Sequence, residues 1–246
     1  MNKKIFLSYA TTHNHYYPFQ QKCAKSFVNF GNFDEIFLCN EKNIKQEYIA
    51  KHSNIFHKKE GTSQGIRGSF FIWKPYLIYR ALNEKMNEGD IIMYADCTIE
   101  QIKPLDEVFE LLKNQSVLPL ILDSEESDER LQTKRDAFIL MNCDEEKYFK
   151  TVYNASHMFF KKDEISLSFV KEWMKYAEDE RIITDMPNEM GMPDHFPLPN
   201  GHRHDQSIYS LLVKKYNLNG IHDLTQYGNP YRNKKEPWGQ LLYHGR

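Results

Sequence analysis

The sequence predicts an α/β fold: a single domain with a Rossmann-like, mostly parallel central sheet flanked by helices. Short apolar runs alternate with amphipathic segments through the first hundred residues, and this alternation is typical of parallel strands joined by crossover helices. The chain of 246 residues is also long enough to bury one large core. We therefore expect one domain over residues 1–246.

In the first half, Gly31 ends one amphipathic segment, and Pro75 falls in the first turn of another, where proline is tolerated. The expected strands cover 5–9, 35–39 and 91–95, and the expected helices cover 18–30, 43–51 and 69–86.

The second half has a more varied pattern. Residues 186–201 contain four prolines and two glycines, which predicts an ordered loop, and the acidic residues 124–130 predict a mobile one. The expected strands cover 117–122 and 157–160, and the expected helices cover 104–113, 145–150, 163–177 and 205–215.

Composition narrows the function classes. Lys plus Arg total 32 against 34 Asp plus Glu, so no global positive charge favours a nucleic-acid partner. The four cysteines form no C-x-x-C pair, which favours a reduced, cytoplasmic chain. No apolar run approaches the roughly 20 residues that a membrane-spanning helix needs, and the run at 5–7 is too short for a signal peptide. The sequence leaves open whether the protein makes peripheral contact with the inner membrane.

Asp96 stands at the carboxyl end of the expected strand 91–95, where open α/β sheets place their ligands. A carboxylate there can hold a divalent cation that bridges a diphosphate. It can equally cap the next helix. The position of Asp96 leaves both interpretations open.

Three runs carry a family resemblance: W-K-P-Y at 73–76, G-D-I-I-x-Y-x-D at 89–96 and H-D-Q-S at 204–207. Together they resemble bacterial glycosyltransferases of the GT-A type in capsule and lipopolysaccharide biosynthesis. The resemblance implies an enzyme of the hexosyltransferase class, which transfers a sugar from a nucleotide-sugar donor to a saccharide or lipid-linked glycan acceptor. Residues 1–100 would form the nucleotide-binding half and 101–246 the acceptor-binding half.

The resemblance also implies a Mn²⁺ or Mg²⁺ ion on a D-x-D motif. Asp96 takes the first acidic position, but Thr98 stands where the second Asp would be. Some relatives complete the metal shell with a carboxyl-terminal histidine, and imidazole is a suitable ligand for this purpose. The metal candidates are therefore Asp96 with His222 or His244.

Donor-binding candidates lie on both sides of this motif. Arg67 stands between two glycines that allow close backbone approach, and a guanidinium binds phosphate with two hydrogen bonds. Lys74 can reach a phosphate or serve as a solvated helix lysine, and Trp73 is read as a core residue. The helix-start interpretation stays open for Asp136. The full donor set is Ala10, Thr11, Arg67, Lys74, Tyr94, Asp96, Arg135 and Asp136.

The catalytic candidates are Asp205 and Gln206. The resemblance places the acid beside the donor sugar or acceptor, and a helix amino terminus stabilises a carboxylate as the anion. A simple helix cap is the structural alternative.

Two rival functions remain open. Potential ligands Asp96, His195, His202, His204 and Asp205 would suit a metal-dependent phosphoesterase. An aromatic content of 14 % would suit a non-catalytic saccharide-binding module.

Overall fold

The computed structural model describes residues 2–12, 16–56, 69–122, 126–199, 201–225 and 238–245. Its central sheet has six strands in the order β2-β1-β3-β6-β5-β7. The strands are β1 (Lys4–Tyr9), β2 (Glu35–Cys39), β3 (Ile91–Ala95), β5 (Val117–Leu122), β6 (Val152–Lys161) and β7 (Ile221–His222). β6 runs antiparallel to β3 and β5, and the other neighbouring strands pair in parallel. The predicted α/β fold with a mostly parallel sheet is confirmed.

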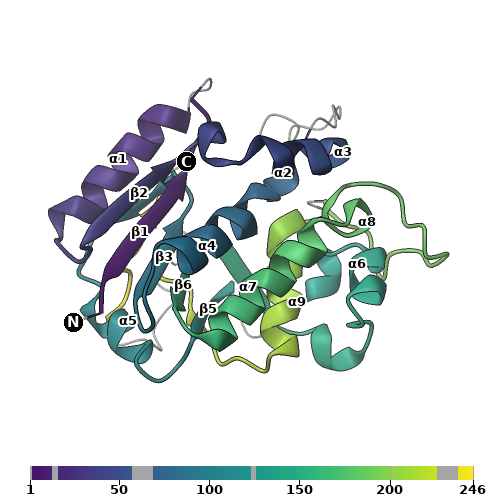
Figure 1. The fold of residues 1–246 in the computed structure, drawn as a ribbon. Helices are drawn as coiled ribbons and strands as arrows, with labels where there is room; N and C mark the ends of the chain where they lie inside the picture. The colour runs from purple at the N-terminus through teal and green to yellow at the C-terminus, as the bar shows by residue number, and fades with distance from the viewer. Residues whose placement is uncertain are drawn as a thin grey trace.

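Helices flank this sheet (Figure 1), with α1 at one end of the molecule and α6 and α8 at the other. The helices are α1 (Tyr16–Asn29), α2 (Gln46–Lys51), α3 (Ser53–Phe56), α4 (Trp73–Glu84), α5 (Asp106–Leu111), α6 (Arg135–Leu140), α7 (Glu164–Ala177), α8 (Glu180–Ile183) and α9 (His204–Lys215). Single 3₁₀ turns cover Glu41–Asn43, Ser69–Phe71, Glu129–Leu131 and Glu146–Tyr148. α7 packs against both α4 and α9.

Successive residues of the strands pack on opposite faces of the sheet, so each face has its own hydrophobic core. Ile5 and Leu7 of β1 pack on the face that α4, α7 and α9 cover, whereas Phe6 packs on the opposite face, where it stacks on Phe27 of α1. Successive strand residues point to opposite sides of a sheet, so both faces of a strand as apolar as β1 are buried. The apolar runs of β1 and β3 therefore form strands buried on both faces, whereas the edge strand β2 is half-buried.

The structure departs from the predicted elements at two informative places. β6 begins at Val152, five residues before the predicted strand, because polar residues such as Asn154 and Ser156 interrupt the apolar pattern there. The helix predicted to begin at residue 69 begins at Trp73. Ser69, Phe70 and Phe71 all have positive φ, between 51° and 63°, which a regular right-handed helix excludes.

A small second sheet determines where the carboxyl terminus lies. β4 (Ile99–Gln101) pairs antiparallel with β8 (Leu242–His244), and Gly245 donates a backbone hydrogen bond to Thr98. This pairing brings the end of the chain next to the segment that leaves β3. Within the described residues, no helix is both long and apolar enough to cross a bilayer.

Candidate functional site

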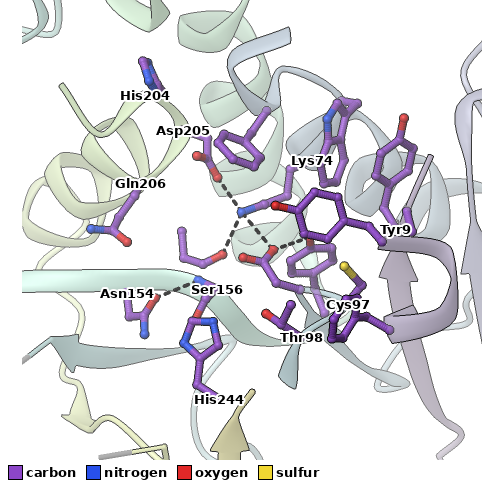
Figure 2. Close-up of a pocket in the computed structure, with 18 of the residues that line it drawn as sticks. Tyr9, Lys74, Cys97, Thr98, Asn154, Ser156, His204, Asp205, Gln206 and His244 are labelled. Carbon is purple, nitrogen blue, oxygen red and sulfur yellow. Dashed lines mark hydrogen bonds and ion pairs between the residues drawn. The ribbon is translucent and has the colours of Figure 1, made fainter. Parts of the chain in front are cut away.

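A cavity of 670 Å³ opens at the carboxyl ends of β1 and β3. Five of its aromatic lining residues, which we call the aromatic wall, are Tyr9, Tyr16, Phe19, Phe71 and Trp73. Four of its polar lining residues, which we call the polar wall, are Asn154, Ser156, Arg203 and Gln206. Figure 2 shows Tyr9 on one side of the cavity and Asp205 with Gln206 on the other.

A buried lysine joins two carboxylates between these walls. Lys74 Nζ lies 2.7 Å from Asp205 Oδ2 and 3.4 Å from Asp96 Oδ1, and donates to the Ala155 carbonyl at 3.0 Å. Figure 2 shows this junction at the centre of the cavity. An ammonium has three N–H donors, and here each has a protein oxygen nearby. We call Asp96, Lys74 and Asp205 the acid–lysine junction.

The electrostatics of the junction keep Lys74 and Asp205 charged at neutral pH. Burial lowers the pKa of Lys74, but the neighbouring carboxylates of Asp205 and Asp96 raise it above its usual value overall. Burial raises the pKa of Asp205 to about 6, against the lowering effect of Lys74. Burial also raises the pKa of Tyr94, so its neutral hydroxyl donates to Asp96 Oδ1 at 2.6 Å.

Asp205 stands in the first turn of α9 without capping the helix. Arg203 occupies the cap position, and its side chain makes no capping hydrogen bond. The Trp173 indole donates to the Asp205 carbonyl at 3.1 Å and so ties this turn to α7. The Asp205 carboxylate is 96 % buried and paired with Lys74, and the cap position of the helix-cap alternative is occupied by Arg203 instead.

The histidines of the phosphoesterase alternative are each held by other protein groups. His202 Nε2 donates to the Ile182 carbonyl at 2.7 Å, and His204 Nδ1 bonds the Ile183 carbonyl at 2.8 Å. His195 lies 2.7 Å from Asp144. Burial lowers the pKa of His202 well below its usual value, so this ring is neutral. The described residues hold no group of three potential metal ligands, so the geometry does not favour this alternative.

Arg135 and Asp136 hold the proline-rich loop and do not line the cavity. The Arg135 guanidinium pairs with Asp144 at 2.8 Å. Asp136 is fully buried, and its carboxylate accepts hydrogen bonds from the backbone N–H groups of Glu189 and Met190. Asp136 lies in the first turn of α6, as the structural alternative expected. The structure therefore separates this pair from the other donor candidates.

The other predicted site residues fall into three groups: those that line the cavity, one that does not line it, and one outside the described residues. Ala10, Thr11, Lys74, Tyr94, Asp96, Asp205, Gln206 and His244 line the cavity. His222 lies on β7 and does not line it. Arg67 lies outside the described residues.

The metal candidates fit a divalent cation only in part. Asp96 Oδ1 is engaged by Tyr94 and Lys74, but no described residue engages Oδ2, and His244 lines the same cavity. Mg²⁺ is commonly held by one or two carboxylates together with substrate phosphates. Asp96 and His244 therefore suit a cation whose remaining ligands come from a bound diphosphate and water.

Sequence reasoning missed Phe19, and it passed over Arg203, which directly precedes the H-D-Q-S run. Arg203 stands between two histidines that are each about 97 % buried, while its own side chain is exposed. The exposed Phe19 gave no usable sequence signal, since its helix has many aromatic residues.

Comparisons with known proteins find similar structures but identify no family for this chain. No family model matches the chain, and no curated protein matches it in sequence. Mouse xyloside xylosyltransferase 1, in its apo form, aligns with a TM-score of 0.49 at 12 % identity, over 100 % of this chain and 97 % of that one. The glycosyltransferase GlyE of Streptococcus pneumoniae TIGR4, also apo, gives 0.48 at 15 %, over 99 % of this chain and 54 % of its own length.

A third structure is a glycosyltransferase involved in glycosylation of the major capsid of PBCV-1. It aligns with a TM-score of 0.49 at 11 % identity, over 98 % of this chain and 93 % of that one. At these values the similarity carries no argument about substrate or residue roles. The function therefore has to be inferred from the cavity itself.

Proposed function

We propose that this protein is a glycosyltransferase that moves a sugar from a nucleotide-sugar donor to a saccharide or lipid-linked glycan acceptor. The acid–lysine junction is the observation that carries the proposal. It places the carboxylate of Asp96, at the carboxyl end of β3, and that of Asp205, in the first turn of α9, in contact with the Lys74 ammonium in the cavity that both walls line. Such a cavity suits a ligand with an aromatic base at one end and a polyol at the other.

The transfer breaks the bond between the anomeric carbon and the diphosphate oxygen, and the nucleoside diphosphate leaves with the bonding electron pair. An acceptor hydroxyl oxygen forms the new bond to the anomeric carbon and gives up its proton to a base or to solvent. Positive charge develops on the sugar during this exchange, so a fixed carboxylate stabilises the transition state more than the ground state. Asp205 is our candidate for that carboxylate, with Gln206 binding sugar hydroxyls.

The donor nucleotide is proposed to lie along the aromatic wall. Ala10 and Thr11 follow β1 at the carboxyl edge of the sheet, beside Tyr9, and ligands of open α/β sheets bind at that edge. The twelve cavity residues numbered below 100 would bind the donor, which matches residues 1–100 as the nucleotide-binding half. Residues 101–246 would then bind the acceptor.

Lys74 and Tyr94 are proposed to position the acids. Both contact Asp96 Oδ1, which fixes the carboxylate and leaves Oδ2 toward the donor. Such supporting contacts orient a carboxylate for a metal or a substrate. A divalent cation bound there with His244 would neutralise the diphosphate as it departs.

The finer assignments rest on the sequence resemblance. It supports a hexosyl donor, a role in surface polysaccharide biosynthesis, and a cytoplasmic protein with peripheral contact to the inner membrane.

A donor screen tests the proposal. The protein is incubated with each common nucleotide sugar and a mixture of glycan acceptors, with and without MnCl₂, and release of nucleoside diphosphate is measured. We expect release from one donor, and we expect it to depend on the acceptor. Release of inorganic phosphate from simple esters, with no release of nucleoside diphosphate, would instead support a phosphoesterase. Binding of saccharides without any release would support a binding module.

A further inference from the structure

Arg203 is a cation on the polar wall, and the proposed function assigns no role to it. Its side chain is exposed toward the cavity, and among the described residues it forms no hydrogen bond or ion pair. Lys74, the other lysine or arginine of the described cavity lining, is held by the acid–lysine junction. Arg203 can therefore bind a ligand without first breaking a protein contact.

The backbone on both sides of Arg203 is clamped. His202 and His204 are buried and bond the carbonyls of Ile182 and Ile183, and the Arg203 N–H donates to the Gln132 carbonyl at 2.9 Å. His204 also has a positive φ of 48°, an unfavourable conformation that the surrounding contacts maintain. The clamp fixes the Arg203 backbone in place beside the cavity, so only the side chain has to be ordered when an anion binds.

The charges of the cavity show why a cation is needed there. The acid–lysine junction carries two negative charges and one positive charge, which leaves one negative charge beside the proposed diphosphate. That excess opposes binding of a doubly charged anion. Arg203 supplies a positive charge in the lining of the same cavity, and the first turn of α9, which follows it, is the positive end of a twelve-residue helix. A guanidinium also matches a phosphate with two parallel hydrogen bonds.

We infer that Arg203 binds the diphosphate of the nucleotide-sugar donor. This inference rests on the proposed function. It assigns the diphosphate-binding role to the polar wall, so the donor bridges both walls: its base lies on the aromatic side and its diphosphate reaches across to α9.

Calorimetric titration of Arg203→Gln tests this assignment. The nucleoside diphosphate that the wild type binds most tightly, and the matching nucleoside, are titrated into the wild type, Arg203→Gln, Arg203→Lys and Arg181→Gln. Arg181 is the matched control, because its guanidinium is exposed, pairs with Asp179 and does not line the cavity. Melting temperatures are measured for all four proteins.

We expect Arg203→Gln to weaken nucleoside-diphosphate binding about tenfold to a hundredfold, as for loss of one charge-assisted contact, and to leave nucleoside binding unchanged. Arg203→Lys should recover part of the loss, and Arg181→Gln should bind like the wild type. If Arg203→Gln binds the nucleoside diphosphate with an affinity within twofold of that of the wild type, the inference is wrong. This holds also where the variant raises only the KM for the acceptor. If the wild type binds no nucleoside diphosphate, with or without MnCl₂, the proposed function fails and the inference fails with it.

Discussion

The two walls of the cavity are built by different interactions. On the aromatic wall, Tyr9 stacks on Trp73 with ring centroids 3.9 Å apart, and both rings also belong to the hydrophobic core. On the polar wall, hydrogen bonds do the positioning: the Asn154 amide reaches the Asp223 carboxylate, and its oxygen accepts from the Ser156 N–H. Stacking tolerates small rotations of a ligand, whereas hydrogen bonds specify direction. The first wall therefore suits base binding, and the second suits the selection of hydroxyl groups.

Lys74 connects these walls. It belongs to α4, as does Trp73, yet its ammonium reaches Asp205 in the first turn of α9. Replacements on either wall should therefore affect different kinetic parameters, while replacement of Asp205 at the junction should affect chemistry most.

The largest effect is expected for Asp205→Asn. The change keeps the side-chain shape but removes the charge that would stabilise the developing positive sugar. We expect turnover to fall about a hundredfold to a thousandfold, the range seen when one preorganised electrostatic group is removed. Donor affinity and melting temperature should change little. Steady-state kinetics with the accepted donor and acceptor measures turnover, and calorimetry measures donor affinity and melting temperature.

Asp163→Asn is the matched control for that change. Asp163 caps α7 through Ser166, and asparagine caps helices nearly as well. Its turnover should equal that of the wild type. Near-normal turnover in Asp205→Asn would leave Asp205 with a structural role in pairing Lys74 and would remove it from the catalytic assignment.

Asp96→Ala is expected to act on binding. It removes the carboxylate that faces the diphosphate and any cation held with it, and it leaves Lys74 with one carboxylate partner. Nucleoside-diphosphate affinity in MnCl₂ should fall about tenfold or more, as expected when a charged contact is lost. Asp106→Ala, on the surface of α5, should bind normally. Unchanged donor affinity in a folded Asp96→Ala protein would refute the strand-end site.

The pH dependence of turnover should report on Asp205. Because its pKa is raised to about 6, the carboxylate is protonated below that pH, and turnover should fall about tenfold per pH unit there and level off above it. Asp205→Asn should lose this acidic limb. The effect on stability has the opposite sign: a raised pKa in the folded state stabilises the fold at low pH, and this contribution is lost as the pH rises through 6. A wild-type profile that is flat between pH 5 and 7 would argue against an essential Asp205 carboxylate.

The smallest effect is expected on the aromatic wall. Phe19 lines the cavity and is 38 % exposed, which leaves its ring face available for a base. Phe19→Ala should weaken nucleotide binding about fivefold, near the lower end for loss of one base–aromatic contact, and leave pyrophosphate binding unchanged. Phe30→Ala is the control, because Phe30 is 37 % exposed and does not line the cavity. Equal affinities in the two variants would place the base elsewhere.

Much of the fold was predictable because local patterns encode it. The strands 35–39, 91–95 and 117–122 were predicted with the bounds the structure gives. β6 was predicted too short, since its polar residues serve the cavity and hide the apolar pattern. The short helix α8 was not predicted, because four residues carry too little periodicity.

The sequence by itself determined the strand-helix order, the position of Asp96 at a strand end and the position of Asp205 near a helix start, because each follows from local periodicity and turn chemistry. The tertiary structure alone decided which charged residues meet. Lys74 contacts Asp205, 131 positions later, while Asp136, which also begins a helix, is buried against a loop. Such pairings depend on how helices pack on the sheet, and hydrophobic burial that drives this packing is non-directional and spread over the whole chain.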